Sequence, residues 1–441
     1  MTSEQAFEEA VRSTMAEVTR DRLVESVRGL VDIPSPTGAE RPLAEWIATA
    51  LGGAGLDARL QPIDDFQANA VAVVRGPDDG LSTLLYAPLD TFTTGTPELD
   101  LPWAGPTMRA DMRPQASVHG DLIVGLGAGN PKGHAAAVMV TVGALAAAGV
   151  PVPGDVVAGF GAGGMPSFAI HGVGVPGREN TGHGVGASFL LERGWTTDRA
   201  LIAKPGWTVS HEEVGLVWID VEVPGEHTYV GSRHRLPYRN AAVVASAVIA
   251  RLEAWCEEYA SAHEVGTMRP QGIVSSVTGG FDRLAAATSA LVRIRLDVRM
   301  TPDQTAPEVL REVRALLRPL GAELGVRLVA TQVAAVPGTR TDPHAEVVQA
   351  ATAAWERVAG RPHDPVLANS GATDANILRL RGVPTARVGM PKVLTAPDGG
   401  PVDFTLGMNI VDVEAMRRLV EVLIRTVLAT GSGSTKSRRV G

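Results

Sequence analysis

The order of strand-like and helix-like segments constrains the fold of this chain more than any single motif does. Apolar runs typical of buried strands, at residues 69–75, 82–87, 154–160 and 199–203, alternate with helix-like segments over the first half of the sequence. The low-charge, alanine-rich stretch 135–150 is shorter than the about 20 apolar residues of a membrane span and predicts a buried helix. Strands that alternate with helices predict an α/β layer built on a largely parallel sheet.

The pattern changes near residue 208 and changes back after Pro337. The intervening segment reads as a strand, a helix, two strands, a helix and a strand, at 216–223, 240–259, 271–278, 291–298, 306–320 and 326–332. This order predicts a small ferredoxin-like α+β domain. Helices at 345–358, 372–380 and 413–428 and a strand at 385–389 return to the α/β pattern. We therefore predict an α/β domain formed by residues 1–207 and 332–429, with residues 208–331 inserted as a second domain and residues 430–441 as a disordered tail.

Two further segments are predicted from their local pattern. Apolar residues at helical spacing predict one helix from residue 6 to 30, and the break VDIPSPTGAE that follows makes Thr37 a candidate cap of the next helix, 41–54. The stretch 165–194 is rich in glycine, contains His171 and His183, and shows no periodicity. We expect a long loop there, and long loops of this kind often take part in function.

Composition and charge exclude several classes of protein. Hydrophobic residues make up 45% of the 441 residues, so the chain can bury a core and is not broadly disordered. With 40 basic and 48 acidic residues the net charge is −8, which disfavours a nucleic-acid partner. A single cysteine, Cys256, excludes an intramolecular disulfide and a metal site built from several thiolates. The charged N-terminal stretch lacks the apolar segment of a secretion signal, and we expect a cytoplasmic protein with no membrane partner.

Seven short motifs follow one another in an order that carries a resemblance. They are LLYAPLDTF, GLGAGNPKGHAAA, VVAGFGAGGMP, ALIAKPG, VPGEHTYVGSRHRLPYRNA, LVRIRLDVRMTP and SGATDA. The chain between Arg22 and Thr426 resembles the zinc-dependent amidohydrolase and peptidase family of aminoacylase, acetylornithine deacetylase, succinyl-diaminopimelate desuccinylase and carboxypeptidase G. The resemblance implies a zinc-exopeptidase-like α/β catalytic domain with a mixed sheet, interrupted by a ferredoxin-like lid that often dimerises. It also implies hydrolysis of an amide next to a carboxylate by two zinc ions and a glutamate base.

The metal-binding positions of the family are where this sequence departs from the resemblance. The five ligand positions and the general-base position fall, in chain order, at Pro88, Asn130, Gly163, Gly164, Lys204 and Phe404, the last with Asp403 beside it. Proline, glycine and phenylalanine side chains offer zinc no donor atom, and an ammonium group repels a dication. We therefore predict a divergent member that uses neither the metal pair nor another cofactor.

Several polar residues remain around these positions and are predicted to form the site. The catalytic candidates are Lys204, Asp90, His134 and Tyr229. The substrate-binding candidates are Lys132, Asn130, His183, His227, Arg239, Asn240, Thr373 and Asp374. A lysine in a pocket can act as a base or as a Schiff-base nucleophile, so Lys204 is either catalytic or a counter-ion to Asp90 or Asp374.

The other candidates also have two interpretations. The oxyanion-stabilising lid histidine of the family falls at Tyr229, with His227 two residues away, and a tyrosine hydroxyl can also donate to an oxyanion. His134 either reaches the cleft or packs within its helix, and His183 is either a general base or a loop residue. The arginine-rich lid stretch that contains Arg239 either binds a substrate carboxylate or is a solvated loop.

Two hypotheses of different class follow. The first is a metal-independent enzyme that acts on a small carboxylate-bearing amide or N-acyl amino acid-like metabolite, by hydrolysis, acyl transfer, cyclisation or lyase chemistry. The second is a non-catalytic relative that binds a ligand or a partner, and a zinc amidohydrolase with displaced ligands is a further alternative. In each case we expect a small ligand with a carboxylate and a homodimer formed through the lid.

Overall fold

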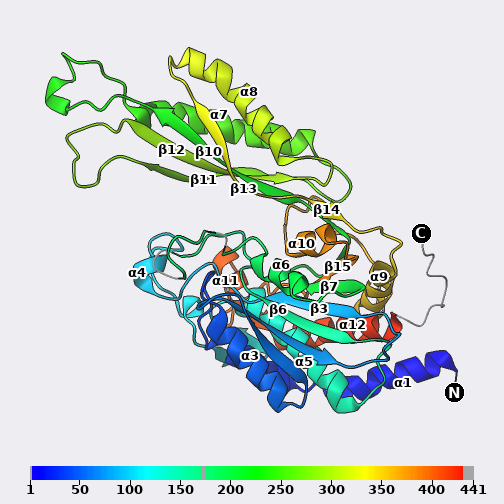
Figure 1. Cartoon of the computed structure of the whole chain (residues 1–441). Helices are drawn as coiled ribbons and strands as arrows, with labels where there is room; N and C mark the ends of the chain where they lie inside the picture. Colours follow the sequence, from blue (N-terminus) through cyan, green and yellow to red (C-terminus); the bar gives the residue numbers. More distant parts are fainter. Residues whose placement is uncertain (1, 171–173, 180, 431–441) are drawn as a thin grey trace. The chain divides into compact units, whose positions relative to one another are not determined.

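The computed structural model describes residues 2–170, 174–179 and 181–430 of the chain, which divides into two compact units (Figure 1). Unit 1 comprises Met1–His211, Thr341–Pro365 and Thr373–Gly441. Unit 2 comprises Glu212–Arg340 and Val366–Ala372. His171 and residues 431–441 of the predicted tail lie outside the described residues.

Unit 1 is built on a seven-stranded mixed sheet. In chain order the strands are β1 (Asp57–Pro62), β2 (Ala68–Val74), β3 (Thr83–Pro88), β6 (Val156–Gly161), β7 (Arg199–Ala203), β8 (Val209–Ser210) and β15 (Thr385–Val388). Their order in space is β1-β2-β6-β3-β7-β15-β8. Strands β6, β3, β7 and β15 pair in parallel, and the outer strands pair antiparallel with their neighbours. This mixed α/β architecture confirms the predicted fold class.

Side chains that alternate along the strands bury two separate cores, one on each face of this sheet. On β3, Leu85 and Ala87 belong to one core, while Leu84 and Tyr86 belong to the other. The first core includes α1 (Ser3–Ala16), α2 (Arg20–Val31), α3 (Arg41–Gly53), α5 (Gly133–Ala148), α9 (Glu346–Ala359) and α12 (Val413–Ala429). The second includes α6 (Val185–Glu192) and α10 (Ala375–Leu380). Burial on both faces explains why the strands are continuous apolar runs.

The alanine-rich helix predicted at 135–150 is α5, and it is buried as expected. Every residue from Gly133 to Val142 is inaccessible to solvent or nearly so, and the helix contacts α2, α12 and β3. Within the described residues, no helix is both long enough and apolar enough to cross a membrane.

Shorter elements complete unit 1. They are α4 (Pro97–Asp100), the turn Ala110–Met112, β4 (Ser117–His119), β5 (Leu122–Val124), the irregular turn Ala128–Lys132, α11 (Phe404–Met408) and β16 (Ile410–Asp412). Strands β16, β5 and β4 form a small separate sheet in that order.

Three local predictions are wrong. The predicted helix 6–30 is the two helices α1 and α2, because the Thr19 side chain accepts the Arg22 amide at 3.2 Å and caps the second helix. Thr37 does not cap α3, since its hydroxyl donates to Asp90 instead. The glycine-rich stretch 165–194 is not all loop, because α6 forms in its second half.

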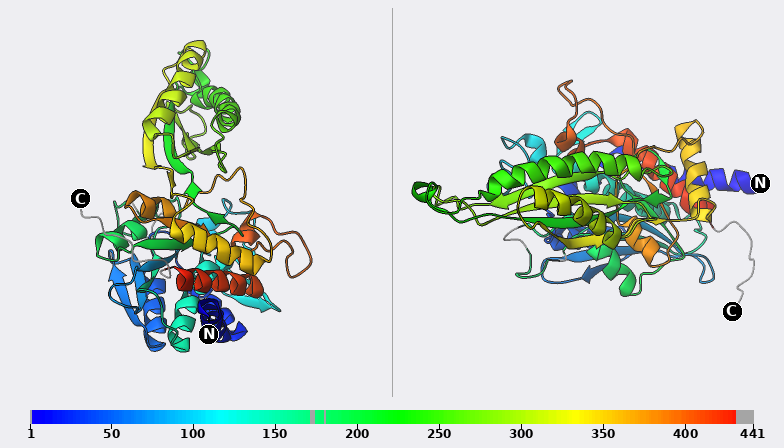
Figure 2. Two further views of the ribbon diagram at one scale, coloured as in Figure 1. Left: turned by 90° about the vertical axis from the view of Figure 1, so that its right-hand side faces the viewer. Right: turned by 90° about the horizontal axis from the view of Figure 1, so that it is seen from above.

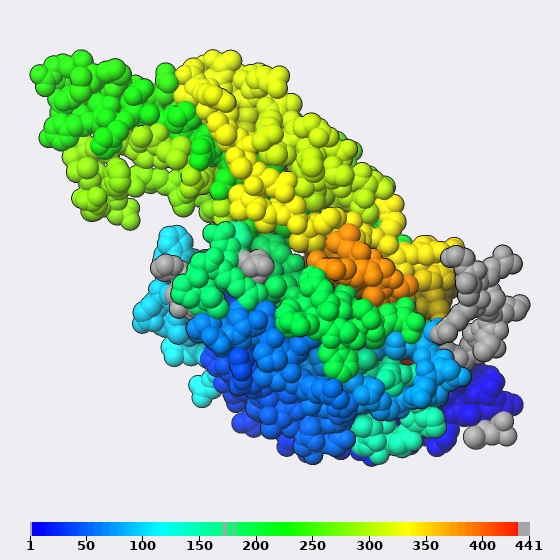
Figure 3. All heavy atoms as spheres, in the orientation of Figure 1, coloured from blue at the N-terminus to red at the C-terminus, as the bar shows by residue number. Residues whose placement is uncertain are grey.

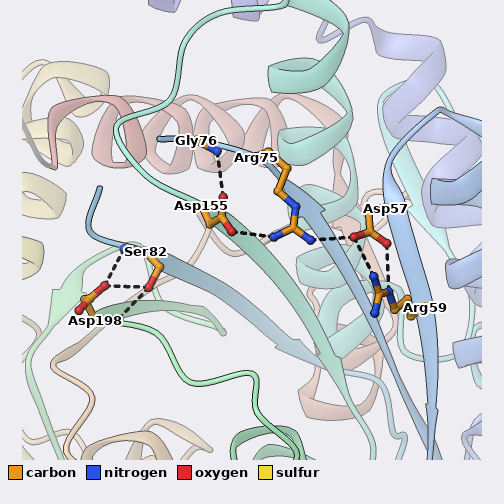
Figure 4. Close-up of polar contacts among 7 residues, drawn as sticks. All are labelled: Asp57, Arg59, Arg75, Gly76, Ser82, Asp155 and Asp198. Atoms are coloured by element: carbon orange, nitrogen blue, oxygen red, sulfur yellow. Dashed lines mark hydrogen bonds and ion pairs between the residues drawn. The ribbon is translucent and has the colours of Figure 1, made fainter. Parts of the chain in front are cut away.

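Charged side chains tie together the ends of β1, β2 and β6 (Figure 4). The Asp155 carboxylate accepts from Arg75 Nη1 at 2.8 Å and from the Gly76 amide at 2.9 Å. Arg75 Nη2 also donates to Asp57 at 2.8 Å, and Asp57 accepts Arg59 Nε at 3.0 Å. Two arginines and two carboxylates therefore form one network that links three strands at this end of the sheet.

Unit 2 is a four-stranded antiparallel sheet with two helices against one face (Figure 2). The strands are β10 (Gly215–Pro224), β11 (Gly272–Gly279), β12 (Leu291–Met300) and β13 (Val329–Val336), and the helices are α7 (Ala241–Ala262) and α8 (Ala306–Glu323). The order in space, β11-β12-β10-β13, is that of a ferredoxin-like fold. On β10, Val217, Ile219 and Val221 are buried beneath the helices, while the residues between them are partly exposed. The pair β9 (Glu212–Glu213) and β14 (Thr339–Arg340) and the turn Val230–Ser232 also belong to unit 2.

Candidate active site

Several of the predicted residues of unit 1 gather at one edge of the seven-stranded sheet. Strands β3, β6 and β7 are parallel, so their carboxyl ends lie together. Asp90, Gly164 and Lys204 each follow one of these ends closely in the chain. The carboxyl edge of a parallel sheet is where open α/β proteins bind their ligands. This edge of unit 1 is therefore the candidate site.

The Asp90 carboxylate is fully buried and holds the loop that follows β6. Its Oδ1 accepts the Gly164 amide at 2.7 Å, and its Oδ2 accepts the Met165 amide at 3.0 Å and the Thr37 hydroxyl at 2.7 Å. Burial raises the pKa of Asp90, and the Thr37 hydrogen bond, the charge of Lys204 and the two loop amides oppose that rise. Through these contacts Asp90 fixes the backbone geometry of the loop after β6.

A second buried carboxylate, Glu40, holds the same loop, and the sequence did not indicate it. Glu40 accepts the Gly163 amide at 2.8 Å, the Gly38 amide at 3.1 Å and Gln67 Nε2 at 3.0 Å. Burial, together with the nearby charge of Asp90, raises the pKa of Glu40 to about 8. Glu40 and Asp90 thus bind three successive amides, and only the folded structure brings them together. The sequence feature that could have pointed to Glu40 is its position directly before α3.

The two glycines of this loop leave no room for larger side chains. A Cβ atom on Gly164 would lie 2.3 Å from Pro88 Cβ and 2.7 Å from Asp374 Oδ2. Gly163 has a φ of +61°, and a Cβ atom there would lie 2.0 Å from the Thr181 carbonyl oxygen. By the resemblance, these are the positions of the family's two glutamates. A glutamate at either position would require the surrounding chain to move.

Lys204 follows β7 and is buried at the carboxyl edge of the sheet. Its amide donates to the Val388 carbonyl at 3.1 Å, which continues the pairing of β7 with β15. The residue is only 5% exposed. Its charge acts on both Asp90 and His134, favouring the ionised carboxylate and the neutral imidazole. Lys204 is therefore a buried lysine of the candidate site that interacts electrostatically with Asp90 and His134.

His134 lies in the first turn of α5 and is buried there. Burial, together with the charges of Lys204 and Arg387, lowers the pKa of His134 to about 3. The imidazole is therefore neutral near pH 7 and is a weak base. This environment favours packing within the helix over general-base catalysis.

Lys132 and Asn130 lie in the turn before α5. Lys132 Nζ donates to the Ile33 carbonyl at 2.8 Å, and burial lowers the pKa of Lys132 to about 7, against the opposing charge of Asp32. Asn130 Nδ2 lies 3.6 Å from Met408 Sδ. Lys132 joins this turn to the end of α2, so its ammonium already has a structural partner.

His183, Thr373 and Asp374 complete the predicted residues of unit 1. His183 has a φ of 59°, its amide donates to the Met165 carbonyl at 2.9 Å, and its ring lies 5.9 Å from that of Phe168. Thr373 Oγ1 accepts the Ala375 amide at 3.2 Å at the start of α10. Asp374 is buried beside Gly164. His183 and Asp374 therefore both lie next to the loop 163–165, which Glu40 and Asp90 hold.

The remaining predicted residues belong to unit 2. His227 Nδ1 donates to the Thr288 carbonyl at 2.8 Å. Asn240 is the N-cap residue of α7, which gives it a structural role in the helix. Tyr229 is 59% exposed, and Arg239 is also exposed. The side chains of Tyr229 and Arg239 are thus accessible for a ligand.

The donor atoms near the candidate site do not fit a zinc pair. Across the described residues, no three His, Cys, Asp or Glu side chains are placed so that they could hold one metal ion together. Asp403, the neighbour of the last expected ligand position, caps α11 through the Leu406 amide at 2.7 Å and pairs with Arg109 at 2.6 Å. Phe404 is 78% exposed. Asp90 and Glu40 each bind backbone amides, and Asp403 binds a backbone amide and Arg109.

Solved structures similar to this chain include peptidases and an amidase, all at low sequence identity. Dipeptidase Dug1p from Saccharomyces cerevisiae is 12% identical, with a TM-score of 0.70 over 96% of this chain and 99% of that chain. Human carnosine dipeptidase 1 is 14% identical, with a TM-score of 0.68 over 96% of this chain and 98% of that chain. An amidase of the hydantoinase/carbamoylase family from Burkholderia multivorans is 17% identical, with a TM-score of 0.60 over 95% of this chain and 99% of that chain. No family model matches the sequence. At these identities the similarity establishes the fold.

Proposed function

We propose that this chain is an enzyme on a peptidase and amidohydrolase scaffold that acts on a small carboxylate-bearing amide without a catalytic metal pair. The scaffold is the one it shares with the dipeptidases and the amidase. The observation that carries the metal-free proposal is Lys204, a buried lysine where the resemblance expects a metal-binding carboxylate. A fixed positive charge there can neutralise the charge that a metal would otherwise neutralise.

Lys204 can supply the electrostatic part of amide hydrolysis. An ammonium group in a buried site stabilises developing negative charge far better than it would in water. In hydrolysis, water adds to the amide carbonyl carbon, the C–N bond breaks, and the proton lost by the water ends on the amine. We assign the developing oxyanion to Lys204 and the proton transfer to His183. The contacts of Asp90 and Glu40 favour a positioning role for both, through the loop 163–165.

The first experiment measures metal content and activity on the same sample. Protein purified without a histidine tag is given zinc, dialysed and analysed by elemental mass spectrometry. It is then assayed with N-acyl amino acids and dipeptides, with and without a chelator. We expect negligible bound metal and turnover that the chelator leaves unchanged. Tightly held metal together with chelator-sensitive turnover would overturn the proposal.

Replacing Lys204 tests the residue that carries the proposal. We expect Lys204→Met to lower kcat/KM by at least about 100-fold, the usual loss when one group that stabilises an oxyanion is removed. The matched control is Lys392→Met, which removes an exposed lysine and should leave kcat/KM unchanged. Circular dichroism of both variants checks that they fold. A folded Lys204→Met variant with full activity contradicts the assignment.

A second candidate, a non-catalytic ligand-binding protein, is favoured by the contacts of the buried carboxylates. Asp90 and Glu40 bind the amides of residues 163–165, and His134 is a weak base. The same substrate panel distinguishes the two functions. Compounds that raise Tm without being converted support the binding protein, and conversion supports the enzyme.

A further inference from the structure

Unit 2 has a groove that the proposed function does not use. It lies between α8 and the chain segment 326–330, which are coloured yellow-green to yellow in Figure 3, and its volume is about 580 Å³. Arg314, Arg318 and Gly321 line it at spacings of four and three residues, so they share one face of α8. The volume falls within the range of small-ligand sites, roughly 300–1,000 Å³.

The charged side chains that line this groove are all positive. Arg314, Arg318 and Arg327 line it, and no aspartate or glutamate does. In the part of the chain that the structure describes, none of these three arginines forms an ion pair, whereas many other arginines of unit 2, such as Arg293 and Arg295, pair with carboxylates. Three unneutralised guanidinium groups around one groove create a local positive potential on a chain of net charge −8.

Part of the groove is held rigid by backbone contacts. Arg314 Nε and Nη2 both donate to the Ala330 carbonyl, at 3.1 and 2.9 Å, so this guanidinium has a fixed orientation. A Cβ atom on Gly321 would lie 2.7 Å from the Val326 carbonyl oxygen, so glycine is what lets the chain after α8 return so closely. Arg318 and Arg327 are exposed and keep their donors available. The groove therefore combines one fixed cation with two that can adapt to a ligand.

We propose that this groove binds a small ligand with two anionic groups, phosphate or carboxylate, through Arg318 and Arg327, with Arg314 as the fixed third cation. The planar guanidinium fork matches both phosphate and carboxylate oxygens in bidentate geometry. Two anionic groups on one ligand match two adaptable arginines. The site is independent of the proposed function, because its residues all belong to unit 2 and none is a predicted catalytic or substrate-binding residue.

Calorimetric titration of the full chain tests the proposal with two defined probes. Inorganic pyrophosphate and citrate are titrated separately at constant ionic strength. We expect at least one of them to bind with a Kd below about 1 mM. The Arg318→Gln/Arg327→Gln double variant should bind at least about tenfold more weakly, because it loses both adaptable forks. Preference for one probe identifies the anionic group.

A matched double variant and a local readout make the result specific. Arg251→Gln/Arg283→Gln removes the same charge from unit 2 outside the groove lining and should leave the Kd unchanged. Hydrogen exchange should show ligand-dependent protection in segment 306–330. The proposal fails if neither probe binds up to about 10 mM. It also fails if both double variants lose affinity equally, or if Arg318→Gln/Arg327→Gln binds as tightly as the unmodified chain.

Discussion

At the scale of single residues, Gly164 shows how the absence of a side chain shapes the candidate site. Its missing Cβ would lie 2.3 Å from Pro88 Cβ, well inside van der Waals contact, and the proline ring cannot turn away. We expect Gly164→Ala to lower the free energy of unfolding by about 1–3 kcal/mol, the usual cost of overpacking. Gly143→Ala, in α5, is the matched control, because nothing lies within 4 Å of its Cβ position and alanine favours helix. Equal urea midpoints for the two variants would show that the loop adapts freely.

At the scale of elements, the two buried carboxylates tie α3 and β3 to the loop after β6, and this makes stability depend on pH. The pKa of Glu40 rises from an ordinary 4.5 to about 8, so the folded chain binds a proton that the unfolded chain lacks between these values. The contribution of Glu40 to the free energy of unfolding is therefore complete below pH 4.5 and is lost as the pH rises to 8. We expect Glu40→Gln to make the fall in unfolding free energy across this range shallower by up to about 1.4 kcal/mol per pH unit. Urea unfolding at several pH values measures the slope, and the exposed Glu25→Gln should reproduce the unmodified slope.

At the scale of the whole molecule, we predict a homodimer formed through unit 2. Strand β11 lies at one edge of its sheet and exposes Ile273 and Val277, which are 54% and 50% accessible. An exposed apolar edge strand is a natural pairing surface. Light scattering of the unmodified protein should give about twice the chain mass of 46.1 kDa. The Ile273→Lys/Val277→Lys double variant should give the mass of one chain. Leu81→Lys, at an exposed apolar position of unit 1, is the control and should remain dimeric. A monomeric unmodified chain would show the dimer prediction to be wrong.

The type and order of most helices and strands could be predicted from the sequence, because the burial of their side chains follows a local period. The alternation of buried residues along β10 and the continuous apolar runs of β3 and β6 are visible without a structure. The ferredoxin-like order of unit 2 followed from that pattern. The break between α1 and α2 was missed, because a single capping threonine at position 19 ends an otherwise continuous helical period.

The composition of the candidate site, in contrast, follows from contacts between distant segments of the folded chain. Glu40, Asp90 and Gly163–Met165 are far apart in the sequence, and no spacing rule predicts that two buried carboxylates bind three successive amides. The same holds for Gly164, whose lack of a side chain matters only because Pro88 and Asp374 occupy the adjoining space. Periodicity records which face of an element is buried, whereas hydrogen bonds and close packing between distant segments exist only once the chain has folded.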